Sequence, residues 1–174
     1  MFERYILDAS ILMERSAESD IEIAYLRSSI FHIASAVEAY VDDIAVLADA
    51  QKTIYTETER DFLNDRKWIL KTSKASVEQG DSNNSIHEKL RYLARKHPRD
   101  GFDILGDSVW QNFQDFKSFR NRLIHPKQST EDISVEDYRS AANNGLITVV
   151  KLLNLFSQCI FRKQLRPRLL ELIE

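Results

Sequence analysis

The stretch IEIAYLRSSIFHIASAVEAYVDDIAVLADA, residues 21–50, decides the fold class of this chain. Its apolar residues recur at spacings of three and four, which is the period of one face of an α-helix. The stripe consists of Ile23, Leu26, Ile30, Ile33, Val37, Val41, Ile44 and Leu47. The pattern predicts one amphipathic helix, the longest element of the chain, against which the other elements pack.

A glutamate interrupts the most apolar part of this helix. Between Ile30 and Val41 the helix is apolar nearly all round, and Glu38 shares a face with Ala34 and Val41. A carboxylate in such a place is costly to bury unless a cation or several donors pair with it. We therefore expect Glu38 to be partly buried and paired, with Arg120 as the first partner to consider.

The periods in the rest of the chain are helical as well. Four glycines and three prolines in 174 residues are too few for the many turns of a β-sandwich or barrel. We expect one all-α domain, residues 1–174, with four to five main helices and a short N-terminal helix. The expected helices cover residues 2–13, 21–50, 56–73, 86–93, 108–125 and 135–156, with loops near 76–85 and 99–107.

Composition restricts the environment and the partners. The lone cysteine, Cys159, lies in an apolar run and indicates a buried thiol in a reducing compartment, so we expect a cytoplasmic protein. Charges within the first fifteen residues disfavour a signal peptide, and no stretch approaches about 18 uninterrupted apolar residues, so no membrane partner is expected. The net charge of −3 means that nucleic-acid binding would need a local basic cluster.

The stretch FRNRLIHP, residues 119–126, gathers the most ionisable chemistry. Asn121 and His125 are four residues apart and share a helical face, while Arg120 lies about 100° round the helix. Pro126 disfavours α conformation in the residue before it, so His125 is expected at the last turn of the helix or just beyond it. An imidazole, an amide and a guanidinium are thus brought within about one and a half turns.

Other common chemistries lack their motifs. The four histidines are scattered without the spacing of a metal site, so no metal or other cofactor is expected. The sequence contains no Walker-type glycine loop, no GxGxxG and no GxSxG, and Cys159 has no basic neighbour in sequence that would mark a nucleophile.

The reaction that suits the remaining residues is cleavage of RNA by its own 2′-hydroxyl, which needs no metal. His125 would transfer protons, Arg120 would stabilise the charge on the phosphorane, and Asn121 would orient the imidazole or the phosphate. Arg122 and Lys127 would bind flanking phosphates.

Structural roles also account for the same residues, and spacing alone favours them. Arg120 with Glu38 would be a plain ion pair, and His125 before Pro126 would cap a helix end. The aromatic stripe that begins at Trp110 is expected in the core, and the cations of residues 162–168 favour a solvated end over a nucleic-acid patch.

Two segments together resemble the HEPN domain superfamily. Arg120-Asn121-x-x-x-His125, at the end of a helix in an all-α chain, resembles its Arg-x4-6-His signature. The segment SAVEAYVD, residues 35–42, is similar to the alanine, aliphatic, glutamate and aromatic pattern in an early helix of several bacterial HEPN families.

The resemblance implies a HEPN-like bundle that forms a homodimer, with two Arg-His motifs facing each other in one composite cleft. Many such proteins are metal-independent endoribonucleases that act as toxins or in phage defence, with an antitoxin or a nucleotidyltransferase as partner. Arg120 and His125 would then be catalytic, Asn121 a supporting residue and Glu38 an accessory residue that positions Arg120. The family also contains inactive members, so a non-catalytic helical module that binds RNA or a partner protein stands as the alternative.

Overall fold

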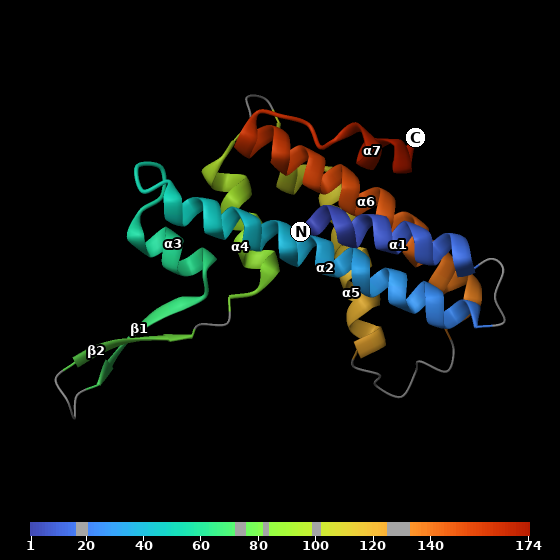
Figure 1. Ribbon diagram of the computed structural model, residues 1–174, viewed down its shortest axis with the longest axis horizontal. Coiled ribbons are helices and arrows are strands. Elements are labelled where there is room, and N and C mark those ends of the chain that lie inside the picture. The colour runs from blue at the N-terminus through green and yellow to red at the C-terminus, as the bar shows by residue number, and fades with distance from the viewer. Residues whose placement is uncertain (17–20, 72–75, 82–83, 99–101, 125–132) are drawn as a thin grey trace.

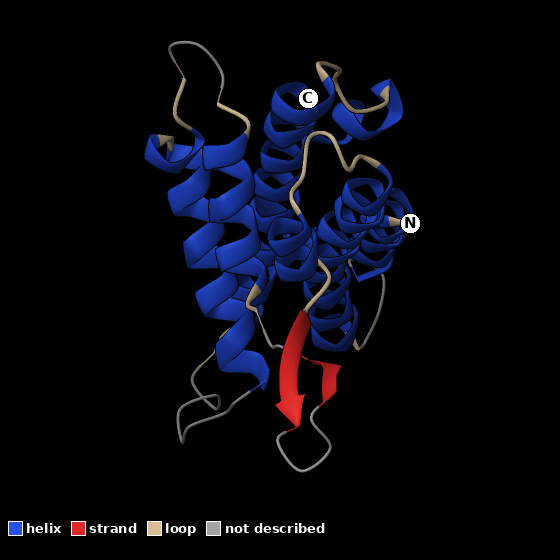
Figure 2. Cartoon of the chain, turned by 90° about the vertical axis from the view of Figure 1, so that its left-hand side faces the viewer, coloured by secondary structure: helices blue, strands red, loops and turns tan. Residues whose placement is uncertain are grey.

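The computed structural model describes residues 1–16, 21–71, 76–81, 84–98, 102–124 and 133–174, and for 67–71 and 76–81 it describes the backbone. Helices dominate this part of the chain, which confirms the expected all-α class (Figures 1 and 2). The helices are α1 (Phe2–Ser16), α2 (Glu22–Ala50), α3 (Glu57–Leu63), α4 (Ile86–Lys96), α5 (Ser108–Ile124), α6 (Val135–Phe161) and α7 (Pro167–Leu170). Two short 3₁₀ turns, η2 (Ile104–Gly106) and η4 (Glu171–Ile173), complete the helical elements.

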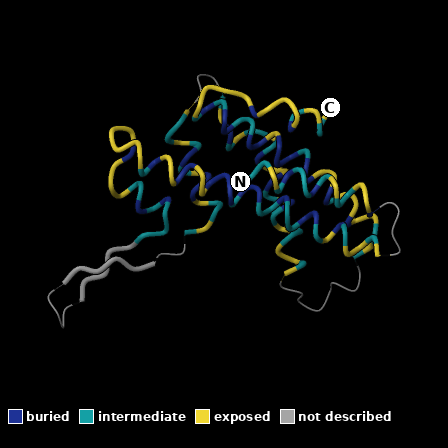
Figure 3. Tube along the Cα trace, viewed as in Figure 1, coloured by how far each residue is buried: buried dark blue, intermediate teal, exposed yellow. Residues whose placement is uncertain are grey.

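Helix α2 is the centre of the fold, as its apolar stripe predicts. It packs against α1 on one side and α6 on another, and its inward face is buried from Leu26 to Ala48 (Figures 1 and 3). Its residues Ile30, Ile33 and Val41 are fully buried. Because α2 is apolar over most of its circumference in this region, it can be covered on several sides at once.

Helices α5 and α6 lie side by side, and α5 carries Arg120 and Asn121 of the candidate site. Asp107 caps α5 by accepting a hydrogen bond from the Val109 backbone N–H at 2.7 Å. Ser134 and Asp137 form the capping box that starts α6, as the sequence predicts. Helix α5 ends at Ile124, directly before His125.

The expectation of a third helix reaching residue 73 is wrong, and so is the expectation of a plain loop over 76–85. Helix α3 ends at Leu63, and Asp65 has a left-handed φ of 54° that turns the chain out of the helix. An antiparallel hairpin follows, β1 (Arg66–Lys71) with β2 (Ser76–Asp81), and it extends away from the helices (Figures 1 and 2). Helical spacing in this short apolar run does not distinguish a helix from a strand.

The base of the hairpin is tied to α4 through Asp65. One of its carboxylate oxygens accepts a hydrogen bond from the Asn84 backbone N–H at 3.1 Å. The other accepts one at 2.6 Å from Lys89, whose ammonium is almost completely buried. Helix α4 begins immediately afterwards with the capping box of Ser85 and Glu88. These contacts fix the N-terminal end of α4, which carries a residue of the candidate site.

Of the loop expected near 99–107, residues 99–101 lie outside the described residues and η2 occupies 104–106.

Helix α6 is long and apolar enough to cross a membrane by length and composition alone. In this fold 56% of its most apolar window is buried, because α2 and α5 pack against it. Cys159, near its C-terminal end, is buried as expected. The composition of α6 is therefore accounted for by its place in the bundle core.

The basic C-terminal cluster contacts the start of the chain. Arg166 and Arg168 both pair with Glu3, at 3.2 Å and 2.7 Å. These ion pairs link the beginning of α7 to α1, so two of the four cations of this cluster have a structural role.

Candidate functional site

A small pocket lies where α2, the N-terminal end of α4 and α5 meet. Its volume is about 200 Å³, which is smaller than a typical site for a drug-sized ligand. Apolar side chains form one part of its wall and polar or charged side chains form the other. The apolar set is Ala34, Val37, Ile86, Phe113 and Phe116, and the polar set is Glu38, Ser85, His87, Lys117, Arg120 and Asn121.

Arg120 is held between the two residues expected to support it. Its Nη2 lies 3.6 Å from Oε1 of Glu38, which confirms the predicted contact between α2 and α5. Its Nη1 donates a long hydrogen bond, 3.4 Å, to Oδ1 of Asn121. Its Nε is buried and has no hydrogen-bond partner among the described residues. Nη1 and Nη2 each carry a second N–H, and these keep donor capacity that a ligand could use.

The pair of Arg120 and Glu38 is not sequestered in the core. The Arg120 side chain is 28% exposed and that of Glu38 is 47% exposed. Ion pairs of this kind stabilise a fold by about 0–1 kcal/mol, because water screens them and ordering the side chains costs entropy. The contact orients Arg120 more than it stabilises the protein.

Comparison of the chain with protein-family models, with curated proteins and with solved structures gives no match. The likeness to the HEPN superfamily thus rests on the residues described above.

Two charged or titratable residues of this pocket do not figure among the residues predicted from the sequence. Lys117 stands three residues before Arg120 and four before Asn121, so helical spacing alone could have placed it on the same face. His87 comes from the first turn of α4, and no motif joins it to Arg120 in the sequence. Only the packing of α4 against α2 and α5 brings His87 to the site.

The His87 ring packs against an aromatic neighbour and lies near charges of both signs. It lies against Trp110 of α5, with ring centroids 5.2 Å apart and an interplanar angle of 34°. Burial lowers the pKa of His87 below its ordinary value, and the nearby charges of Lys117 and Arg91 lower it further. His87 is therefore neutral at pH 7, with one ring nitrogen able to accept a proton.

The other predicted site residues are not in this pocket. Arg122 is exposed, and its guanidinium lies over the ring of Phe119, 5.5 Å from the centroid. His125 and Lys127 lie outside the described residues, as does Pro126. The structure thus brings together Arg120, Asn121 and Glu38, and it places Arg122 beside another part of the surface.

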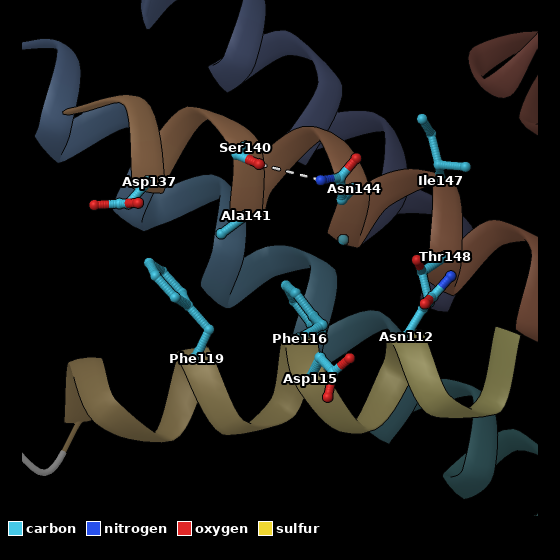
Figure 4. Close-up of a pocket in the computed structure, with 11 residues that line it drawn as sticks. Asn112, Asp115, Phe116, Phe119, Asp137, Ser140, Ala141, Asn144, Ile147 and Thr148 are labelled. Carbon is cyan, nitrogen blue, oxygen red and sulfur yellow. Dashed lines mark hydrogen bonds between the residues drawn. The ribbon is translucent and has the colours of Figure 1, made fainter. Parts of the chain in front are cut away.

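That other part is a groove of about 560 Å³ between α5 and α6 (Figure 4). Phe116 and Phe119 point from α5 towards α6, and Asp115 and Asp137 lie along the groove (Figure 4). The pKa of Asp137 is lowered chiefly by its hydrogen bonds to Ser134, which are those of the capping box. The carboxylates make this groove a poor binding surface for a polyanion.

Proposed function

We propose that this protein is a metal-independent endoribonuclease that cleaves RNA by attack of the 2′-hydroxyl on the adjacent phosphate. The observation that carries the proposal is the partly exposed guanidinium of Arg120, oriented by Glu38 and Asn121 at the wall of a pocket. A fixed guanidinium beside an open space is suited to a phosphate, which accepts charge-assisted hydrogen bonds from two of its nitrogens.

In this reaction the substrate supplies its own nucleophile, so the protein needs to move protons and stabilise charge. Arg120 would stabilise the additional negative charge of the phosphorane. His125, the residue after the last one of α5, would transfer a proton, and a helix C-terminus favours its protonated form. Asn121 would orient the phosphate or the imidazole, and Arg122 and Lys127 would bind flanking phosphates.

The HEPN resemblance supplies the biological setting of the proposal. The protein would act in the cytoplasm as a homodimer, as a toxin or a phage-defence effector, with an antitoxin or a nucleotidyltransferase as its partner. Its substrate would be single-stranded or structured RNA. Static light scattering at micromolar concentration tests the dimer, and a monomeric mass would contradict a composite cleft.

The test of the activity is cleavage of single-stranded RNA by the purified protein in EDTA. We expect products with cyclic phosphate ends and loss of cleavage in Arg120→Ala and in His125→Ala. Arg4→Ala is the matched control, because Arg4 is 87% exposed on α1 and, within the described part of the chain, forms an ion pair only with Asp8 of its own helix. Cleavage that persists unchanged in both site variants would reject the proposal, as would an inactive wild-type protein.

The alternative function is a non-catalytic helical module that binds RNA or a partner protein. It is favoured by the ion pair between Arg120 and Glu38, which a purely structural role would also require. Under this alternative Arg120→Ala lowers the melting temperature markedly and the wild-type protein shows no cleavage. Under the proposed function the same variant loses cleavage and keeps nearly all of its stability, because the pair is partly exposed.

A further inference from the structure

The described histidines differ in how their ring nitrogens are used. Nδ1 of His32 hydrogen-bonds to the Ser28 backbone carbonyl at 2.8 Å, and Nε2 of His97 to the Tyr55 hydroxyl at 2.7 Å. His87 makes no hydrogen bond within the described residues. Its Nδ1 is buried without a partner, whereas Nε2 is not among the buried atoms that lack one, so Nε2 is the nitrogen that would contact a ligand. Among the described histidines, His87 is the one that no structural hydrogen bond accounts for.

The position of His87 gives this imidazole a specific neighbourhood. It lines the same pocket as Arg120 and Asn121, although it belongs to a different helix. Its ring packs against the ring of Trp110, which belongs to α5. A phosphodiester that contacts Arg120 in a pocket of about 200 Å³ has little room to avoid His87. The imidazole and the guanidinium are thus arranged to contact one ligand.

We propose that His87 is a catalytic residue of the same site and acts as the general base of RNA cleavage, an inference that rests on the proposed function. Nε2 of His87 takes the proton of the 2′-hydroxyl while the 2′-oxygen forms a bond to phosphorus. The bond from phosphorus to the 5′-oxygen breaks, and the leaving 5′-oxygen takes a proton from the general acid, for which His125 is the proposed residue. The products are a 2′,3′-cyclic phosphate and a 5′-hydroxyl, so no oxidant, reductant or metal is needed.

The charges around His87 agree with this role. A general base must be unprotonated before the reaction. Burial, Lys117 and Arg91 favour the neutral imidazole, and they outweigh the opposite effect of Glu88. After proton transfer the imidazolium would lie near the negative phosphorane, whose charge offsets the repulsion by Lys117.

The main test compares two RNA substrates at one position, one with the natural 5′-oxygen leaving group and one with a 5′-sulfur leaving group. A thiolate leaves without protonation, so the sulfur substrate makes a general acid unnecessary but still requires the base. We expect His87→Gln to slow cleavage of both substrates by about 10²- to 10⁴-fold, the usual contribution of general base catalysis. His125→Ala should cleave the oxygen substrate slowly and should cleave the sulfur substrate at close to the wild-type rate. His32→Gln is the matched control and should cleave at the wild-type rate.

The outcomes separate this inference from the proposed function. If Arg120→Ala abolishes cleavage while folded His87→Gln cleaves within about threefold of His32→Gln, the base assignment is overturned and the ribonuclease proposal stands. If His87→Gln cleaves the sulfur substrate at the wild-type rate, His87 acts as an acid and the base assignment is overturned. If the wild-type protein cleaves neither substrate in EDTA, both proposals fail.

A measurement on the wild-type protein covers the case in which His87→Gln does not fold. Diethyl pyrocarbonate modifies accessible, unprotonated imidazoles, and mass spectrometry locates the modified residue. A non-cleavable RNA with a 2′-deoxy nucleotide at the scission position should protect His87 and leave His32 unprotected. Equal modification of His87 with and without this RNA at saturation would overturn the inference.

Discussion

Replacing Gly145 by alanine tests how closely α5 and α6 approach each other. A Cβ at residue 145 would lie 2.5 Å from both Cδ2 and Cε2 of the Phe116 ring, about 1 Å closer than a favourable carbon–carbon contact. Phe116 is only 7% exposed, and relieving the contact would require its ring to shift within the wall of the groove between α5 and α6. Overpacking of this kind costs about 1–3 kcal/mol.

The same substitution also has a favourable effect, which sets the expected net change. Alanine in a helix interior is more stable than glycine by about 1 kcal/mol. Since two ring atoms are contacted at once, we expect the clash to lie near 3 kcal/mol and the free energy of unfolding to fall by about 2 kcal/mol. For a chain of this size that corresponds to a drop of about 4–8 °C in melting temperature.

The assay is thermal and urea unfolding of Gly145→Ala beside Asn143→Ala, an exposed position on the same helix. The control should be as stable as the wild-type protein or slightly more stable, because alanine is the better helix former. Combining Gly145→Ala with Phe116→Leu should cost less than the sum of the two single changes, since the smaller side chain relieves the clash. If Gly145→Ala raises the melting temperature as much as the control does, the close contact between the helices is refuted.

Three further predictions concern single contacts. The pKa of Glu59 is lowered to about 2, chiefly by its hydrogen bond to Lys96, so its stabilising contribution is complete above about pH 4.5 and is lost as the pH falls towards 2. In urea unfolding across this range, Glu59→Gln should be less stable than the wild-type protein at pH 7, and the difference should vanish near pH 2. Ser134→Ala removes the cap of α6 and should lower the free energy of unfolding by about 1 kcal/mol, measured in the same way. Glu38→Gln should change it by less than about 1 kcal/mol while reducing RNA cleavage, because the pair with Arg120 orients a side chain more than it stabilises the fold; unchanged cleavage would reject the accessory role.

The long helices and their starts were predictable because their signals are local. The stripe from Ile23 to Leu47 predicts α2 almost to the residue, and the Ser134 capping box marks the start of α6. The hairpin was missed for the same reason. In the short run around Trp68, apolar residues at irregular spacing fit a helix or a strand, and the left-handed turn at Asp65 that decides between them leaves no periodic signal.

The residues of the candidate site also fall into those that the sequence could predict and those that it could not. Helical spacing places Arg120 beside Asn121 and could have added Lys117, because all three lie on α5. The pairing of Glu38 with Arg120 was anticipated from chemistry, since a carboxylate in an apolar face requires a cation. His87 was not anticipated, because its distance of more than thirty residues from Arg120 carries no information about proximity.

The sequence by itself determined the helical class, the central helix α2 and the residues of α5 that carry ionisable chemistry, because these depend on the period of apolar residues along one element. Only the tertiary structure decided which side of α5 forms a pocket, and that α4 delivers His87 to it. Contacts between elements distant in sequence depend on how side chains pack, as Gly145 against Phe116 illustrates. No local pattern encodes that packing.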